Sequence, residues 1–249
     1  MSFLSVEKIS AGYGGHPILA DVSFQLEQGC MMGILGANGC GKTTLLKTIC
    51  GILPHKGTCL LEQTVLEQLS ARRMARLVGY IPQRSGISID ISVLDVVMMG
   101  FNPRLGLLER PGRKMQDLAA QALEQVGLGG REQSNYLCLS EGQKQLCILA
   151  RTLVSGSRLL LLDEPVSGID QNGMELFYKT MDYLKTHYDL AIILISHDLD
   201  YVAKYADHVV LLDKTVAKQG TVKEVFESKE FERIFYTGEE SWVREEEHK

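Results

Sequence analysis

The segment from Gly36 to Thr43, which reads Gly-Ala-Asn-Gly-Cys-Gly-Lys-Thr, constrains this chain more than any other. Its spacing fits the pattern of a glycine-rich loop that cradles phosphates. The apolar run Met31–Leu35 before it predicts a strand buried on both faces, and a helix is expected over 43–50, stopping at Gly51. A strand, a glycine turn and a helix in this order point successive N–H groups at the phosphates of a nucleoside triphosphate. A chance glycine turn would lack this register.

The loop predicts specific contacts with the nucleotide. We expect the Lys42 ammonium to reach the β- and γ-phosphates and the Thr43 hydroxyl to bind Mg²⁺. Cys40 is either a small loop residue without a chemical role or a thiol whose alkylation blocks nucleotide binding by bulk. The further candidates for ATP contact in or beside the loop are Gly36, Asn38, Gly39, Gly41 and Thr44.

A second apolar run, Leu159–Leu162, ends in Asp163, Glu164 and Pro165. Ligands of open α/β sheets bind beyond the carboxyl ends of the strands, so these two acids are expected to face the phosphates. Asp163 would hold Mg²⁺ through water, and Glu164 would orient and deprotonate the attacking water. The alternative is that the acids merely end a strand and start a turn.

The rest of the pattern predicts an α/β fold. Alternating apolar residues at Val22, Phe24 and Leu26 indicate a half-buried strand of an antiparallel unit. Residues 92–154 show helical spacing, with loops at 102–103 and 111–112. Buried strands alternating with helices indicate a largely parallel sheet, with the helical block inserted into it. Further strands are expected over 77–81, 159–162, 191–195 and 209–212.

Composition narrows the functional classes. The chain has 249 residues and a net charge of −5, which argues against a nucleic-acid partner. No apolar run approaches the roughly 20 residues of a membrane span, and the N-terminus lacks a secretion signal. The six cysteines form no C-x-x-C pair and no Cys/His group with zinc spacing, which favours free thiols in a reducing cytosol. The charged tail 245–249 is expected to be solvated.

Further motifs closely resemble the nucleotide-binding subunit of ABC transporters. The specific element is Leu139–Gln143, which reads Leu-Ser-Glu-Gly-Gln; other phosphate-loop enzymes lack it. Tyr80–Gln83, Ser167–Asp170 and Ser196–Asp198 complete the set, and the resemblance runs from Tyr13 to about residue 225. It implies a RecA-like P-loop core (1–86 and 157–249), an N-terminal antiparallel β subdomain and a helical subdomain over about 87–156, all in one ATPase domain.

The resemblance also implies roles for single residues. Tyr13 falls where the family stacks an aromatic ring on adenine, although it could instead pack between N-terminal strands. Gln83 would touch Mg²⁺ and the attacking water; otherwise it is a polar residue at a strand end. His197 would contact the γ-phosphate, unless it is structural. Asp170 would link two subunits.

The pentapeptide implies a dimer. In this family it caps the γ-phosphate held by the opposite subunit, so Ser140, Gly142 and Gln143 would act on the nucleotide of a second copy. One chain alone would be incomplete, and ATP would join two copies head to tail. Glu141 stands where the family most often has glycine; we expect it to point to solvent, because a carboxylate would repel phosphate.

The helical block suggests transport. The segments 92–103 and 122–128 resemble the helical lobe found in importers of iron–siderophore complexes, haem, cobalamin and certain metal ions. Such a role implies separate integral-membrane permease subunits, an extracytoplasmic substrate-binding protein, and a location on the cytoplasmic face of the cell (inner) membrane. The alternative is a cytosolic ABC ATPase acting as an assembly factor, such as an iron–sulfur scaffold partner. Translation or DNA-repair ABC proteins and phosphoryl-transfer kinases fit the sequence less well.

Overall fold

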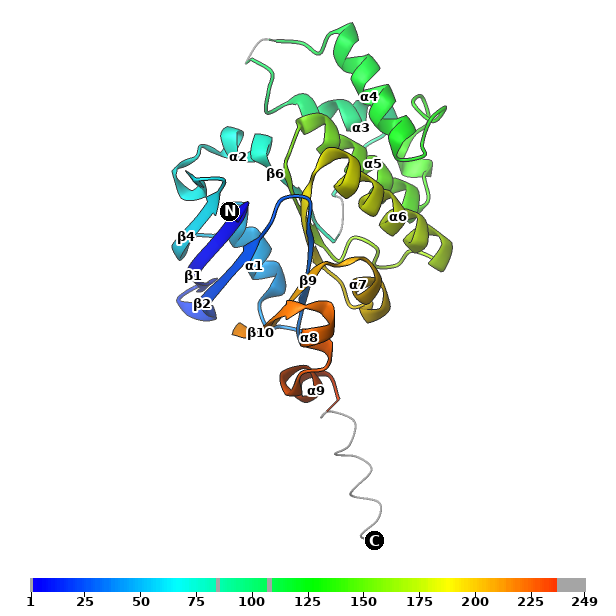
Figure 1. Ribbon diagram of the computed structural model, residues 1–249. Helices are drawn as coiled ribbons and strands as arrows, with labels where there is room; N and C mark the ends of the chain where they lie inside the picture. Colours follow the sequence, from blue (N-terminus) through cyan, green and yellow to red (C-terminus); the bar gives the residue numbers. More distant parts are fainter. Residues whose placement is uncertain (1, 84–85, 107–108, 237–249) are drawn as a thin grey trace. The chain divides into compact units, whose positions relative to one another are not determined.

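The computed structural model describes residues 2–83, 86–106 and 109–236, so the charged tail 245–249 lies outside the described residues. The chain divides into two compact units (Figure 1). Unit 1 comprises residues 1–67 and 193–249, and unit 2 comprises residues 68–192.

Unit 1 begins with an antiparallel sheet in the order β2-β1-β4-β5. Gly14 and Gly15, with φ of 55° and 82°, make the tight turn between its first two strands, as a two-residue hairpin requires. Val22, Phe24 and Leu26 are buried while their neighbours on the strand are exposed, so the predicted alternation is confirmed. The strands are β1 (Leu4–Tyr13), β2 (His16–Leu26), β4 (His55–Leu61) and β5 (Thr64–Val65).

Unit 1 also holds part of the parallel sheet. Strand β3 (Met31–Leu35) is buried throughout, as predicted, and pairs in parallel with β9 (His208–Asp213). Strand β10 (Thr215–Thr221) adds to β9 in antiparallel fashion. A Cβ at Gly33 would lie 2.7 Å from Val202 Cγ1, so this glycine permits close packing of helix α7 on β3. The helices of this unit are α1 (Lys42–Ile49), α7 (Leu199–Tyr205), α8 (Val222–Phe226) and α9 (Lys229–Phe235).

Unit 2 combines a parallel strand pair with a helical cluster. Strand β6 (Val78–Ile81) pairs in parallel with β7 (Leu159–Asp163). The helical spacing of residues 92–154 is confirmed, since α3, α4 and α5 pack on one another. The helices are α2 (Ala71–Leu77), α3 (Val93–Met98), α4 (Arg113–Gln125), α5 (Glu141–Ser155) and α6 (Gln171–Tyr188), with short 3₁₀ turns at Met99–Phe101 and Tyr136–Cys138. A further 3₁₀ turn, Leu66–Gln68, spans the point in the sequence where unit 1 ends and unit 2 begins.

Several element boundaries differ from the prediction by one residue. Helix α1 begins at Lys42 rather than Thr43, because the glycine before it already serves as the N-cap. The strand expected from Leu77 begins at Val78, since Leu77 completes helix α2. Strand β8 (Ala191–Ile195) has the predicted bounds and is fully buried. The α/β fold with a parallel and an antiparallel sheet is therefore as predicted.

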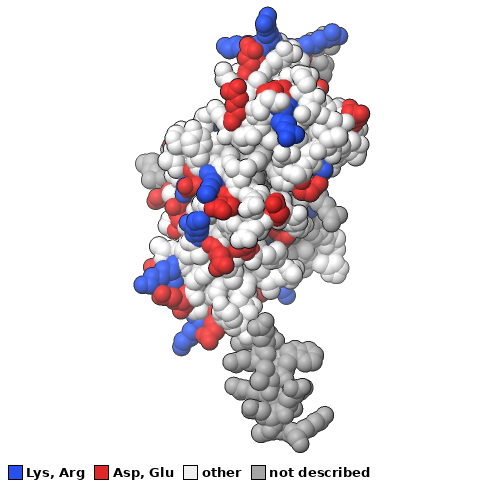
Figure 2. All heavy atoms as spheres, turned by 90° about the vertical axis from the view of Figure 1, so that its right-hand side faces the viewer, with Lys and Arg blue, Asp and Glu red and all other residues white. Residues whose placement is uncertain are grey.

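The surface is mixed in charge. On the face drawn in Figure 2, lysine and arginine side chains are interspersed with aspartate and glutamate. Among the described residues, none of the helices is both long enough and apolar enough to cross a bilayer.

Candidate functional site

The loop between β3 and α1 has a backbone that other residue types could hardly adopt. Gly36, Gly39 and Gly41 have φ of 152°, 79° and 110°, in the region that favours glycine. A Cβ at Gly36 would collide with the carbonyl oxygen of Leu212, and one at Gly41 would lie 2.5 Å from Leu19 Cδ2. The dihedral angles therefore favour glycine at all three positions, and close packing beneath the loop adds a second reason at Gly36 and Gly41.

Lys42 lies in the first turn of α1, with its side chain turned back under the loop. The residue is 7% exposed, and its Nζ donates to the carbonyl oxygens of Gly36 at 2.7 Å and Ala37 at 3.0 Å. A buried cation is costly unless it is compensated, so this ammonium favours an anion beside it. The first turn of α1 carries no acidic residue, and its N-terminal N–H groups add partial positive charge. Thr43 is exposed at this helix end.

Cys40 packs inside the loop. The residue is 5% exposed, and a Cβ at Gly36 would lie 2.8 Å from its sulfur. Burial raises the pKa of the Cys40 thiol, and the nearby Lys42 offsets part of that rise. Its carbonyl oxygen accepts a hydrogen bond from Lys214 N at 3.3 Å. Cys40 thus fills space and helps to fix the loop.

In unit 2, the carboxyl ends of β6 and β7 carry four polar side chains that form two hydrogen-bonded pairs. Asp163 ends β7 and is 4% exposed, and its Oδ2 accepts a hydrogen bond from Tyr80 Oη at 3.1 Å. Gln83 Nε2 donates to Glu164 Oε2 at 2.7 Å. Gln83, Asp163 and Glu164 were all singled out from the sequence, whereas the hydroxyl of Tyr80 was not.

Glu164 adopts an unusual backbone conformation. Its φ of 49° is left-handed, which costs a residue with a side chain about 1–2 kcal/mol. Such strain is typical of positions where the direction of a side chain matters more than stability. The hydrogen bond from Gln83 fixes the carboxylate that this conformation presents.

The N-terminus of α5 carries the pentapeptide. Ser140 is the N-cap: its Oγ accepts from Gln143 N at 3.3 Å, and Gln143 Oε1 accepts from Ser140 N at 3.2 Å. This capping box was missed in the sequence, although Ser-x-x-Gln is its usual signal. Glu141 points to solvent as predicted, since its side chain is 66% exposed and pairs with Lys144 at 2.8 Å.

Gly142 has a packing role as well. A Cβ there would lie 3.2 Å from Ile169 Cγ2, and a Cβ at Gly173 would lie 2.6 Å from the same atom. The first turns of α5 and α6 thus both approach Ile169 closely. A cavity of about 380 Å³ adjoins this contact and is lined by Gln83, Tyr136, Gln145 and Ile169 among others. Within the described residues, Gln145 Oε1 is buried without a hydrogen-bond partner.

The remaining candidate residues lie at the surface of their units. Tyr13 ends β1, pairs with His16 of β2 and is 45% exposed. His197 follows β8 in unit 1 and is exposed, and so is Asp170, the N-cap of α6 in unit 2. Unit 1 therefore contains the phosphate loop, and unit 2 contains Asp163, Glu164 and the helix that begins at the pentapeptide.

A phosphate-type loop with a buried lysine, together with a strand-end Asp-Glu pair, defines an ATP-binding protein of the α/β class. The sequence matches the ABC transporter family over residues 19–167, which is more than half of the chain. The chain belongs to that family. It is an ATPase whose nucleotide is ATP, and its RecA-like core is the one found in solved members.

Individual relatives agree with this assignment. The manganese transport system ATP-binding protein MntB of Listeria innocua serovar 6a is 34% identical over 226 residues, covering 90% of this chain and 92% of that protein. The hemin import ATP-binding protein HmuV of Bordetella pertussis is 34% identical over 242 residues, covering 93% and 91%. Among solved structures, cbiO1 from Clostridium perfringens, part of the ABC transporter complex cbiONQ, matches with a TM-score of 0.81 at 27% identity, covering 99% of each chain.

The burial of Cys40 leads to a prediction about its reactivity. Only the thiolate reacts with iodoacetamide. Because Cys40 is buried and its pKa is raised, its alkylation rate should be at least about ten times lower than that of the exposed Cys138. Peptide mass spectrometry after timed alkylation of the folded chain measures both rates. In urea the difference should vanish. Equal rates in the folded chain would contradict the packed position of Cys40.

Proposed function

We propose that this ATPase drives the import of a transition-metal ion or metal chelate through separate membrane permease subunits. The observation that best supports ATP binding is the buried Lys42 ammonium, which is held by the carbonyls of a loop at the N-terminus of α1. Such a loop supplies positive charge and N–H donors to a triphosphate. The cargo class follows from the relatives, one named for manganese and one for hemin.

The residues proposed to contact ATP within one copy lie in unit 1. Lys42 binds the β- and γ-phosphates, and exposed Tyr13 offers its ring to the adenine. His197 contacts the γ-phosphate. The loop residues Gly36, Asn38, Gly39, Cys40, Gly41 and Thr44 contact the nucleotide through backbone or short side-chain groups. The whole chain then acts as one ATPase domain, with a core of 1–86 and 157–249 and a helical subdomain over 87–156.

The donor set fits a magnesium ion. Thr43 offers a hydroxyl oxygen, Gln83 an amide oxygen and Asp163 a carboxylate, and Mg²⁺ prefers oxygen ligands with retained water. The Tyr80 hydrogen bond already orients the Asp163 carboxylate. When bound, the ion neutralises charge on the transferring phosphoryl group.

Glu164 is the proposed general base. Its carboxylate would take a proton from the attacking water, and the Gln83 amide, 2.7 Å away, holds it in place. Activation of water rather than of an organic hydroxyl makes the reaction hydrolysis.

We further propose a head-to-tail homodimer with two ATP molecules between the copies. Ser140, Gly142 and Gln143 lie at the exposed or half-exposed start of α5, a 15-residue helix whose N-terminus favours an anion. In the dimer this helix end caps the γ-phosphate bound to the other copy, and Asp170 contributes to the interface between the two copies. Release of phosphate then separates the copies.

The transport system places the ATPase on the cytoplasmic face of the cell membrane. In this proposal it is held there by integral permease subunits, and an extracytoplasmic binding protein delivers the cargo. No nucleic acid takes part, in keeping with the net charge of −5.

Replacement of the proposed base tests the hydrolysis step. Glu164→Gln keeps an acceptor for the Gln83 amide but cannot accept a proton, so ATPase turnover should fall about 10²–10⁴-fold while ATP still binds. Gel filtration with ATP and Mg²⁺ should show a stable dimer. Lys42→Ala serves as a control that loses nucleotide affinity and stays monomeric. A Glu164→Gln chain that remains monomeric with saturating ATP would contradict the proposed dimer.

Ser140 can be tested with its capping role kept constant. Ser140→Ala loses both the cap, worth about 1 kcal/mol, and the hydroxyl, whereas Ser140→Asn keeps a good N-cap. We expect both variants to lose ATPase activity about 100-fold, as when one transition-state donor is removed, while the monomer still binds ATP. Full activity in Ser140→Asn would reduce Ser140 to a helix cap. Loss of ATP binding by the monomer would refute action on a second copy.

Co-purification tests the transport role. An affinity-tagged chain, expressed in its own host and extracted from membranes with detergent, should bring down a polytopic membrane protein. A second extraction uses the Glu164→Gln variant with ATP. It should yield more of the complex, because this variant traps the bound state. Recovery with soluble partners alone would support an assembly factor instead of an importer.

A further inference from the structure

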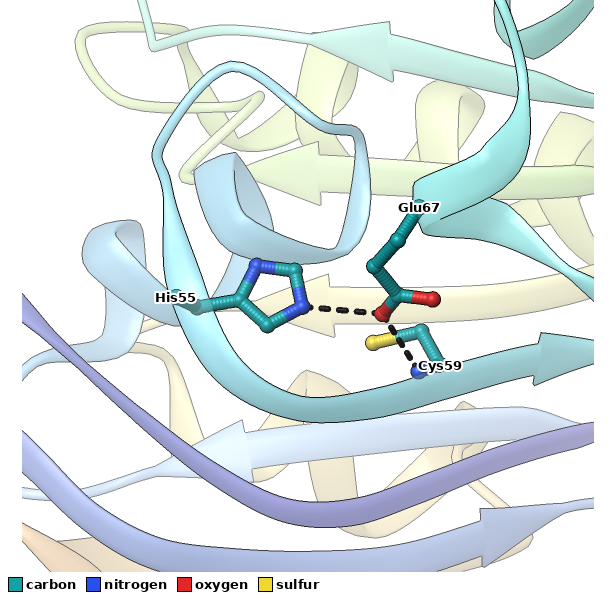
Figure 3. A group of neighbouring side chains, drawn as sticks. All are labelled: His55, Cys59 and Glu67. Carbon is teal, nitrogen blue, oxygen red and sulfur yellow. Dashed lines mark hydrogen bonds and ion pairs between the residues drawn. The ribbon is translucent and has the colours of Figure 1, made fainter.

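Three side chains of unit 1 with metal-binding chemistry gather at β4 and the turn that follows β5. His55, Cys59 and Glu67 each offer one ligand atom, and these atoms all lie within 4.8 Å of one another. Figure 3 shows the imidazole, the thiol and the carboxylate converging from β4 and the turn that follows β5.

The strand geometry explains why distant residues meet. His55 and Cys59 lie on β4 on either side of an irregularity, because the pairing of β4 with β1 shifts register between Thr58 and Lys56. Gly57 between them has φ of 95°, and a Cβ there would lie 2.5 Å from the carbonyl oxygen of Glu7 on β1. The absence of a side chain at Gly57 thus permits the close approach of β4 to β1. The tight turn at Glu62 and Gln63 then returns the chain so that Glu67 reaches Cys59.

The cluster is well ordered by hydrogen bonds. Glu67 Oε1 lies 2.8 Å from His55 Nε2 and accepts from the backbone N–H of Cys59 at 2.6 Å. His55 Nδ1 lies 3.4 Å from the carbonyl oxygen of Leu53. A proton on Nδ1 that points at this carbonyl leaves the Nε2 lone pair for a metal, which is the usual arrangement of a metal-binding histidine.

Burial gives the cluster an inner and an outer side. Cys59 is 1% exposed and the His55 side chain 7%, whereas the Glu67 side chain is 28% exposed. An ion can therefore enter past the carboxylate and meet the imidazole and the thiol behind it. The fourth ligand would be a water on the outer side.

We propose that His55, Cys59 and Glu67 form a binding site for a divalent transition-metal ion of the zinc class. Zinc accepts nitrogen, sulfur and oxygen ligands together at about 2.0–2.3 Å in a tetrahedron. Ligand atoms around such an ion lie roughly 3–4 Å apart, within the spread of the present cluster. Mg²⁺ and Ca²⁺ prefer oxygen ligands and suit this set poorly.

Binding requires small, defined changes. The ion takes the place of the hydrogen between His55 Nε2 and Glu67, and these two atoms separate by a few tenths of an ångström. The displaced proton moves to Nδ1 of the same ring, which faces the carbonyl oxygen of Leu53. The thiol of Cys59 becomes a thiolate and releases its proton to solvent. The site joins β4 to the turn after β5 and does not depend on the identity of the transported cargo.

A cobalt titration of the full chain tests the site directly. The purified protein is stripped with EDTA, and Co²⁺ is added without nucleotide while thiolate-to-cobalt charge-transfer absorption is recorded. We expect one equivalent of Co²⁺ to bind with a thiolate band, and one equivalent of Zn²⁺ to displace it. Absence of such a band in the folded wild-type chain would overturn the proposal.

Three variants locate the ligands. Cys59→Ser should abolish the thiolate band, and Glu67→Gln, which still offers an acceptor to the Cys59 N–H, should weaken Co²⁺ binding at least about tenfold. Cys138→Ser removes an exposed thiol and is the matched control, with binding unchanged. A band that persists in Cys59→Ser, or that disappears in Cys138→Ser, would assign the metal to other thiols.

Thermal unfolding gives an independent readout. At free Zn²⁺ about 100 times the dissociation constant, linkage predicts a rise in Tm of roughly 5–10 °C for wild type and Cys138→Ser. Glu67→Gln at the same Zn²⁺ concentration should show a clearly smaller rise. If circular dichroism shows that Cys59→Ser does not fold, the Glu67→Gln variant tests the site alone. A Co²⁺ affinity and a Zn²⁺-induced Tm shift equal to those of the wild type would then refute the site.

Discussion

A buried ammonium group is the constraint on which the account depends. Lys42 is enclosed by a loop in which a side chain at Gly36 or Gly41 would collide with its surroundings, and its Nζ is held by two carbonyl oxygens. These carbonyls carry only partial charge, so the positive charge is incompletely compensated until an anion arrives. The start of α1 adds N–H donors at the same place. A triphosphate is the ligand that this combination suits, and membership of the ABC transporter family agrees with it.

The second unit supplies chemistry that the loop lacks. Tyr80 and Gln83, both from the region of β6, hold the two acids at the carboxyl end of β7. Tyr80 orients the carboxylate proposed for Mg²⁺, and Gln83 holds the proposed base. The pentapeptide helix begins with a complete capping box, so the serine proposed to act on a second copy is already ordered in one copy. Such order lowers the entropy that is lost when the phosphate binds.

The sequence predicted most of the fold because its signals are local. The buried strands at 31–35 and 191–195 and the helical spacing after residue 92 were evident from hydrophobic patterning. The glycine loop was recognisable because its dihedral angles demand a fixed spacing. Boundaries differed by one residue where a cap decided between two states, as at Lys42. The fold class was therefore predictable in outline.

What escaped prediction depends on contacts between distant segments. The hydroxyl of Tyr80 meets Asp163 across 83 positions of sequence, and no local pattern announces that pair. The cluster of His55, Cys59 and Glu67 escaped prediction because its spacing matches none of the usual zinc motifs. A strand places alternate residues on one face, so a histidine and a cysteine four positions apart could have been considered together. The glutamate joins them only through the turn at residues 62–63, which the sequence did not predict.

The central claim is that ATP is bound between two copies, by the glycine loop of one and the pentapeptide helix of the other. A crystal structure of Glu164→Gln with ATP and Mg²⁺ measures this directly. The account predicts that Ser140 Oγ of one copy lies within hydrogen-bond distance of the γ-phosphate held by Lys42 of the other. A γ-phosphate bound by Lys42 while residues 139–143 of both copies stay remote from it would contradict the account.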